Sequence, residues 1–145
     1  MLFRSDLLLG DLLARRAALT RAVQHTKGPA PRDPDREADI AGLSVRCRPT
    51  DHSVPTVALR LSCGGRTLGW SSDTPFDPDL IQWLQEGANL VVHETSPPPT
   101  HTPIEPLNDL PASVRQRIRL IHMPDGFDQT STDMRCLRQG EVVQV

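Results

Sequence analysis

The sequence predicts an α/β fold in which a mixed β-sheet carries helices on one face. Strand-length apolar or alternating segments recur along the chain, and helical patterns with polar caps separate the later ones. Glycine, proline and aspartate mark the changes between the two periodicities. The predicted strands are residues 43–48, 56–62, 66–71, 89–92 and 118–121. Strands that alternate with helices in this way are typical of a sheet covered by its own connections.

The first 42 residues are predicted to be an N-terminal helix followed by a linker. Between residues 5 and 24, Leu8, Leu12, Leu19 and Val23 recur at helical spacing. A proline-rich, charged stretch then runs to about Asp39 and is typical of a surface loop. We therefore expect two parts, residues 1–42 and residues 43–145.

The clearest β-hairpin joins residues 56–62 to residues 66–71. Gly64-Gly65 lies between them, and paired glycines favour the tight turn of a two-residue hairpin. The segment before it, residues 43–48, alternates like a strand and is separated from the hairpin by the turn-forming residues 51–55.

One helix has strong signals at both ends. Asp77 precedes Pro78, which is the combination of an N-cap and a proline at the first helical position. Gly87 is a natural stop. The short apolar run at residues 89–92 then predicts a buried strand.

The C-terminal third gives weaker signals. Residues 97–106 read as a loop, residues 111–117 as a short helix and residues 118–121 as a strand. The tail, residues 134–137 and 141–145, resembles a closing hairpin around Gln139-Gly140.

Composition excludes several classes of function. Sixteen basic and eighteen acidic residues give a net charge of −2, which excludes binding to nucleic acid by charge alone. Aromatic residues make up 3% of the chain and tyrosine is absent, so a base-stacking platform is not expected. There is no P-loop, no G-x-G-x-x-G and no G-x-S-x-G motif.

The cysteines and the N-terminus indicate a cytoplasmic protein with no membrane partner. Three widely spaced cysteines form neither a disulfide framework nor a thiolate zinc cluster. The apolar start of the chain is interrupted by Asp6, Gly10 and Asp11, reads poorly as a signal peptide and is too short to span a bilayer.

Side chains of the types that commonly bind metals follow the predicted strands. They are His52, Asp73, His93, Glu94 and His122, with His101 in the loop beyond Glu94. A single histidine after a strand is more often structural, but several at successive strand ends favour a site at one sheet edge. Histidine with aspartate suits zinc, manganese or iron.

A Ser/His/Asp triad is the weaker alternative. Ser53, Ser71 and Ser72 are available to it, but none lies on a recognisable nucleophile elbow.

Four short motifs together resemble the C-terminal half of the metallo-β-lactamase superfamily, in its ribonuclease Z and phosphodiesterase-like branch. They are D-H-S-V-P-T at 51–56, L-G-W-S-S-D-T at 68–74, V-V-H-E-T at 91–95 and R-L-I-H at 119–122. The resemblance covers about residues 43–124. It implies half of an αββα sandwich and metal-dependent hydrolysis of a phosphodiester or related ester.

The resemblance also implies roles for single residues. His52, Asp73 and His122 would be metal ligands, with Asp73 bridging two ions, and the metal would be Zn²⁺, Mn²⁺ or Fe²⁺. His101 would act on the leaving group or the transition state. His93 and Glu94 would be supporting groups that fix the orientation of the site.

The chain departs from the superfamily pattern in two places. The H-x-H-x-D-H signature is absent upstream, where His25 is the one histidine before His52, and Ser72 replaces the usual glycine before the aspartate. We therefore expect a partial chain or one member of a split pair, acting on a small-molecule or nucleic-acid phosphodiester. The alternative is a non-catalytic half-domain for dimerisation or regulation. Because half a sandwich leaves one sheet face uncovered, we expect an apolar face and either a homodimer or a complementing N-terminal half.

Overall fold

The computed structural model describes residues 37–40 and 42–145, so the helix predicted at residues 5–24 lies outside the described residues. Residues 37–40 were expected to lie in the linker, but they form strand β1 (Glu37–Ile40). β1 pairs antiparallel with β2, with Ala38 opposite Val45. The backbone N–H and C=O groups of residues 37–40 therefore pair with β2 at the edge of the sheet. The charged sequence of this segment did not predict a strand.

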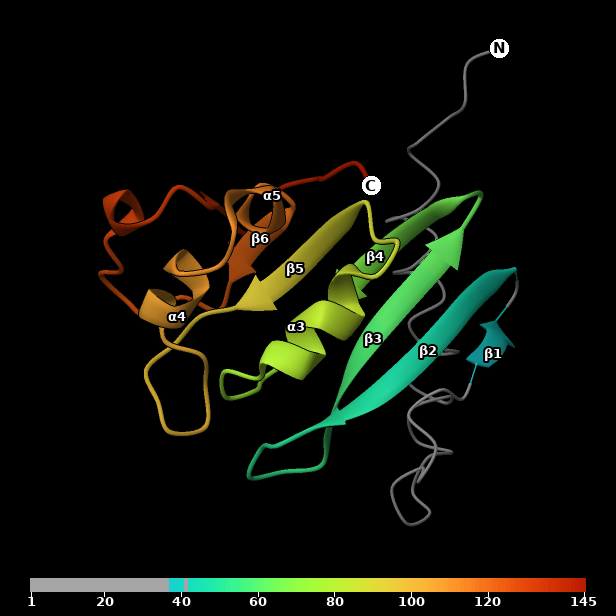
Figure 1. Ribbon diagram of the computed structural model, residues 1–145, viewed down its shortest axis with the longest axis horizontal. Coiled ribbons are helices and arrows are strands. Elements are labelled where there is room, and N and C mark those ends of the chain that lie inside the picture. Colours follow the sequence, from blue (N-terminus) through green and yellow to red (C-terminus); the bar gives the residue numbers. More distant parts are fainter. Residues whose placement is uncertain (1–36, 41) are drawn as a thin grey trace.

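Within the described residues, seven strands form one mixed sheet in the order β1-β2-β3-β4-β5-β6-β7 (Figure 1). The later strands are β2 Leu43–Thr50, β3 Thr56–Cys63, β4 Arg66–Trp70, β5 Leu90–Glu94, β6 Ile118–Ile121 and β7 Arg135–Cys136. β1 to β4 pair antiparallel, and β5, β6 and β7 continue the sheet parallel to β4. The predicted α/β class with a mixed sheet is confirmed.

The β3–β4 hairpin turns on the two glycines that predicted it. Gly64 and Gly65 have φ of 58° and 75°, and Cys63 pairs with Arg66 across the turn. Two successive residues with positive φ give a turn whose twist matches that of the flanking strands. This turn fixes the register of β4, and β4 leads to Asp73.

Helix α3 (Pro78–Gln85) begins and ends as its caps predict. The Asp77 side chain accepts hydrogen bonds from the N–H groups of Asp79 and Leu80 at 2.9 and 3.0 Å. Gly87 has φ of 67° just beyond the helix end. The helix lies across β3, β4 and β5 (Figure 1).

The two faces of the sheet are covered differently. The main core lies between one face and the helices, and comprises Ala58, Leu80, Ile81, Leu84, Ala88, Val91, Leu107, Ile118, Leu120 and Met134. Strand register places a second apolar set on the opposite face, namely Val45, Leu61, Leu68, Leu90 and Val92. Those side chains are buried or half-buried, and Trp70 on the same face is 37% exposed. Val45, Leu90 and Val92 on this face are only 4–5% exposed, so the uncovered apolar face and dimerisation through it both stay predictions.

The C-terminal third corrects two predictions and adds one element. Residues 97–106 are not all loop, because helix α4 (Ile104–Asn108) buries Leu107 in the core. Helix α5 (Ala112–Arg115) is shorter than residues 111–117, because Arg117 N already bonds to Val114 O in a tight final turn before β6. A 3₁₀ turn, η1 (Gln129–Ser131), precedes β7.

The tail does not form the predicted hairpin. β7 pairs parallel with β6, and residues 141–145 belong to no strand. Glu141 instead accepts a hydrogen bond from Arg138 N at 3.0 Å and forms an ion pair with Arg135. These local contacts close a turn around Gly140, so the last residues do not pair back along β7.

Candidate metal centre

The candidate ligands converge at one edge of the sheet, where β2, β4, β5 and β6 end. β4, β5 and β6 run parallel, and β2 shares their direction because β3 is antiparallel to both of its neighbours. Carboxyl ends of strands with one direction meet at one edge. His52, Asp73, Glu94 and His122 therefore lie together although they come from four separate segments.

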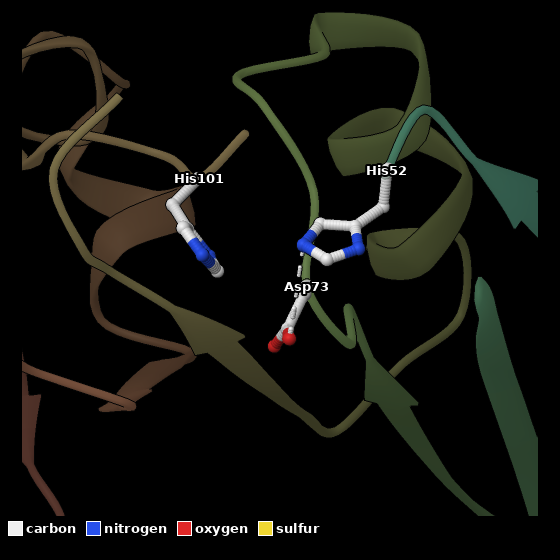
Figure 2. A group of neighbouring side chains, drawn as sticks. All are labelled: His52, Asp73 and His101. Atoms are coloured by element: carbon white, nitrogen blue, oxygen red, sulfur yellow. Dashed lines mark ion pairs between the residues drawn. The ribbon is translucent and has the colours of Figure 1, made fainter. Parts of the chain in front are cut away.

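Asp73 lies between two of the predicted ligands. Its Oδ2 is 4.0 Å from His52 Nε2, and its Oδ1 is 3.2 Å from His122 Nδ1 (Figure 2 shows the His52 side). Each carboxylate oxygen thus faces a different histidine, as a carboxylate that bridges two cation positions would. The Asp73 side chain is 42% exposed, so the position is open to small ligands.

His101 lies next to both of these histidines. Its ring centroid is 5.3 Å from that of His52 and 5.1 Å from that of His122, with edge-to-face geometry in both cases. Its Nδ1 is 3.0 Å from Glu94 Oε1. The sequence placed His101 in a loop, and the structure brings that loop over the cluster.

Glu94 is fully buried and has one oxygen without a donor. Its Oε1 accepts from the backbone N–H groups of Thr74 and Thr102 at 3.0 and 3.3 Å, besides its contact with His101. Its Oε2 has no hydrogen-bond partner among the described residues and lies 3.9 Å from His122 Nδ1. A buried carboxylate oxygen left in this way is costly unless a cation or a proton faces it.

His93 lies on the opposite side of β5 from Glu94. Side chains alternate along a strand, so His93 faces the helix-covered core, where Leu120 is its neighbour in β6. Its Nδ1 is 2.7 Å from the Glu94 carbonyl oxygen, to which it donates. Burial lowers the pKa of His93 to about 4, against the raising effect of that hydrogen bond, so the ring is neutral near pH 7. A supporting role for His93 stays a prediction; it is not part of the cluster.

The structure groups the ligands differently from the prediction. Within the described residues, two sets of three have ligand atoms within 4.8 Å of one another: His52 with Asp73 and His101, and Glu94 with His101 and His122. In the predicted set of His52, Asp73 and His122, each histidine lies near Asp73, because the two histidines face different oxygens of its carboxylate. His101 belongs to both sets, and no spacing in the sequence indicated this.

Two non-glycine residues at the site have left-handed backbones. Ser72 has φ of 53° and His122 has φ of 56°. Ser72 Oγ donates to Val57 O at 2.7 Å, and this bond holds the residue in place of the glycine that the resemblance led us to expect. Such conformations are typical of sites where the surrounding structure fixes a functional group.

The serines at the end of β4 have structural partners. Ser71 is fully buried, and its Oγ donates to Ser72 O at 2.8 Å and accepts from Glu94 N at 3.0 Å. Ser72 Oγ is bound to a backbone carbonyl. These bonds join the ends of β4 and β5, which leaves neither hydroxyl placed as the nucleophile of a triad.

Comparison with known proteins places the chain in a family. The family model described as "Anti-Pycsar protein Apyc1" matches residues 12–143. The chain belongs to the Apyc1 family. Among the described residues, no helix of this family member has the length and apolar composition needed to cross a membrane.

Two curated relatives come from Dictyostelium discoideum. The "cGMP-dependent 3',5'-cGMP phosphodiesterase A" is 26% identical over 117 residues, which are 70% of this chain and 14% of the relative. The "cAMP/cGMP-dependent 3',5'-cAMP/cGMP phosphodiesterase B" is 25% identical over 114 residues, 65% of this chain and 10% of the relative. This Apyc1-family chain thus spans a small part of each.

Solved structures show the fold. The metallo-β-lactamase fold protein YhfI from Bacillus subtilis superposes with a TM-score of 0.56 at 16% identity, over 72% of this chain and 48% of YhfI. A diphosphatase from the PhnP family gives 0.51 at 10% identity, over 89% of this chain and 56% of that one. The expected metallo-β-lactamase fold is confirmed, over about half the length of these neighbours.

Proposed function

We propose that this chain is part of a metal-dependent phosphodiesterase that hydrolyses 3′,5′-cyclic nucleotides, with His52, Asp73 and His122 as metal ligands. The observation that carries the proposal is the position of Asp73, which presents one carboxylate oxygen to each histidine. The printed names of the two Dictyostelium relatives support the substrate class, since both are cyclic-nucleotide phosphodiesterases.

The residues present fit a divalent cation. Three imidazoles and two carboxylates are a donor set that zinc, manganese and iron accept. The unpartnered Oε2 of buried Glu94 is a second indication, because positive charge at the cluster would compensate it. When bound, such an ion neutralises phosphate charge and lowers the pKa of a coordinated water.

Residues of this chain hold the candidate ligands in place and limit access to them. Asp73 and His122 come from rigid strand ends, so their separation is fixed before any ligand arrives. Glu94 orients His101 through Oε1. Only 10% of the His52 side chain is exposed, against 42% for Asp73 and 49% for His122, so a ligand reaches the cluster most easily on the side of Asp73 and His122.

Metal content and cyclic-nucleotide hydrolysis test the proposal together. We expect the purified chain to retain zinc or manganese and to lose it on chelation, and we expect hydrolysis of 3′,5′-cGMP or 3′,5′-cAMP when a polypeptide that carries the H-x-H-x-D-H signature complements the chain. Asp73→Asn should remove both properties. Asp79→Asn, an exposed aspartate in the first turn of α3, is the matched control and should change neither. Less than about a tenth of an equivalent of metal, with no effect of EDTA, would overturn the proposal.

A non-catalytic half-domain is the second candidate. It is favoured by the absence of an H-x-H-x-D-H signature upstream of His52 in the sequence. Stoichiometric metal without hydrolysis, together with a dimer in sedimentation experiments, would favour this candidate over the enzyme.

A further inference from the structure

The sheet face opposite the helices is apolar across several neighbouring strands. Leu80 of α3 and Leu107 of α4 belong to the core on the other face, and Val114 of α5 packs against that core. The strand register turns a second apolar set the opposite way, from β1 to β5: Ile40, Val45, Leu61, Leu68, Leu90 and Val92. A contiguous apolar surface of this kind is typical of a face that packs against another apolar surface.

Side chains on this opposite face are buried although no described α-helix or strand lies over them. Val45 is 4% exposed, and Leu90 and Val92 are each 5% exposed. Neighbouring side chains of one sheet stand side by side and roughly perpendicular to it, so they cover one another's flanks and leave their ends open. The low exposure therefore indicates a covering segment, and it has to come from elsewhere in the chain.

Residues 5–24 have the apolar pattern and the length to cover this face. Their leucines and one valine recur at helical spacing and form an apolar stripe: Leu8, Leu12, Leu19 and Val23. Twenty helical residues extend about 30 Å, which is close to the width of a seven-stranded sheet at about 4.8 Å per strand. A single helix of this size can lie against most of the opposite face.

The chain enters the sheet at a place from which residues 5–24 can reach it. β1 is an edge strand, and its Ala38 and Ile40 side chains lie on the opposite face, because they pair with Val45 and Leu43. Residues 25–36 connect the two parts, and twelve extended residues span up to about 40 Å. This connection is long enough for the segment to fold back over the face.

Charge at the far side of the face matches the same segment. Arg119 in β6 pairs with Val92 and shares its face, and its Nε is buried without a hydrogen-bond partner among the described residues. Asp6 and Asp11 lie in the first half of the segment, which is the half farther from β1 along the chain. A carboxylate near Arg119 would compensate this partly buried cation.

We propose that residues 5–24 pack as an amphipathic helix on the opposite face and are its occupant in this chain. The apolar face is then covered within one polypeptide and not by a second copy. This inference is independent of metal binding and hydrolysis, so neither result of those experiments decides it. A complementing N-terminal half that packs on the same face would first have to displace this segment.

Cys47 is a natural probe of the cover. It lies two residues after Val45 in β2 and shares its face, and burial raises the pKa of its thiol. Each cysteine of the full chain is followed by timed reaction with N-ethylmaleimide and mass spectrometry of its peptide. We expect Leu12→Asp to accelerate the reaction of Cys47 at least about tenfold, because a charge in the apolar stripe displaces the segment. Ala14→Asp is the matched control: it places the same charge on the other side of the predicted helix and should leave the rate unchanged.

Cys136 reports whether the fold persists, because it packs against the core on the helix-covered face. Its rate should be the same in the native chain and in Leu12→Asp. Faster reaction of both thiols means general unfolding, and the milder Leu12→Thr then replaces Leu12→Asp. Equal Cys47 rates in the native chain and in a folded Leu12 variant would overturn the proposal. Protection of Cys47 that is lost on dilution, together with a dimer in sedimentation experiments, would also overturn it, since a second copy would then be the occupant.

Discussion

Asp73 Oδ1 and His122 Nδ1 lie 3.2 Å apart, although the strands that present them, β4 and β6, do not pair. β5 lies between these strands, and its last residue, Glu94, is buried beneath the contact with Oε2 3.9 Å from His122 Nδ1. The contact between Asp73 and His122 therefore depends on β4, β5 and β6 all ending at the same edge of the sheet.

The left-handed backbone of His122 predicts how substitutions at this position change stability. Its φ of 56° is strained for any residue with a Cβ, and its side chain is about half exposed, at 49%. We expect His122→Gly to be more stable than His122→Ala by about 1 kcal/mol, because glycine relieves the strain that alanine keeps. Urea denaturation of both variants measures the difference. Both variants should bind cobalt at least about tenfold more weakly than the native chain. Equal stability, or unchanged cobalt affinity, would contradict the role given to this residue.

Removing the Glu94 carboxylate should destabilise the fold. Glu94→Ala leaves the buried N–H groups of Thr74 and Thr102 without their acceptor. The expected loss in the free energy of unfolding is about 3 kcal/mol, measured by urea denaturation in the absence of metal. Glu86→Ala is the control: its side chain is 73% exposed, and Arg60 keeps its hydrogen bond to the Glu86 backbone oxygen, so the loss should stay below about 1 kcal/mol. A milder effect at position 94 than at position 86 would refute the buried network.

His93 should make the fold sensitive to acid. Burial lowers its pKa in the folded chain to about 4 from 6.5, so the unfolded chain binds a proton that the folded chain rejects between these values. Its contribution is present above pH 6.5 and is lost as the pH falls toward 4, by up to about 3 kcal/mol. Urea denaturation across this range should show a shallower pH dependence for His93→Gln than for the native chain. Parallel curves for the two proteins would show that another group controls the acid response.

Gly69 should not accept a side chain. A Cβ at this position would lie 2.7 Å from the backbone oxygen of Leu84 and 3.2 Å from Leu84 Cβ. Since a backbone oxygen cannot rotate away, Gly69→Ala must push α3 off the sheet, and we expect a loss of about 3 kcal/mol. Gly64→Ala, which meets no atom within 4 Å but has a positive φ, should lose about 1 kcal/mol. Thermal unfolding of both variants tests this order. The reverse order would mean that α3 can shift away from β4 at little cost in stability.

Local signals in the sequence predicted the elements that lead to the site. Asp77-Pro78, Gly87 and Gly64-Gly65 predicted a helix and a hairpin where the structure has them, because caps and tight turns depend on residues that are adjacent in the chain. α4 was missed because Pro103 and Pro106 made its sequence look like loop, while burial of Leu107 stabilises the helix. The prediction of a hairpin in the tail was wrong because β7 pairs with β6 and not with the residues that follow it.

The sequence by itself determined the chemistry of the site: imidazoles and carboxylates placed where successive strands end. Only the tertiary structure decided how they are used. Strand alternation turns Glu94 toward the cluster and His93 into the core, and the parallel register of β4, β5 and β6 aims the two oxygens of Asp73 at different histidines. The anchored loop then sets His101 against Glu94. These relationships depend on distances across strands and loops that are far apart in the chain, and such distances are fixed by packing rather than by spacing along the sequence.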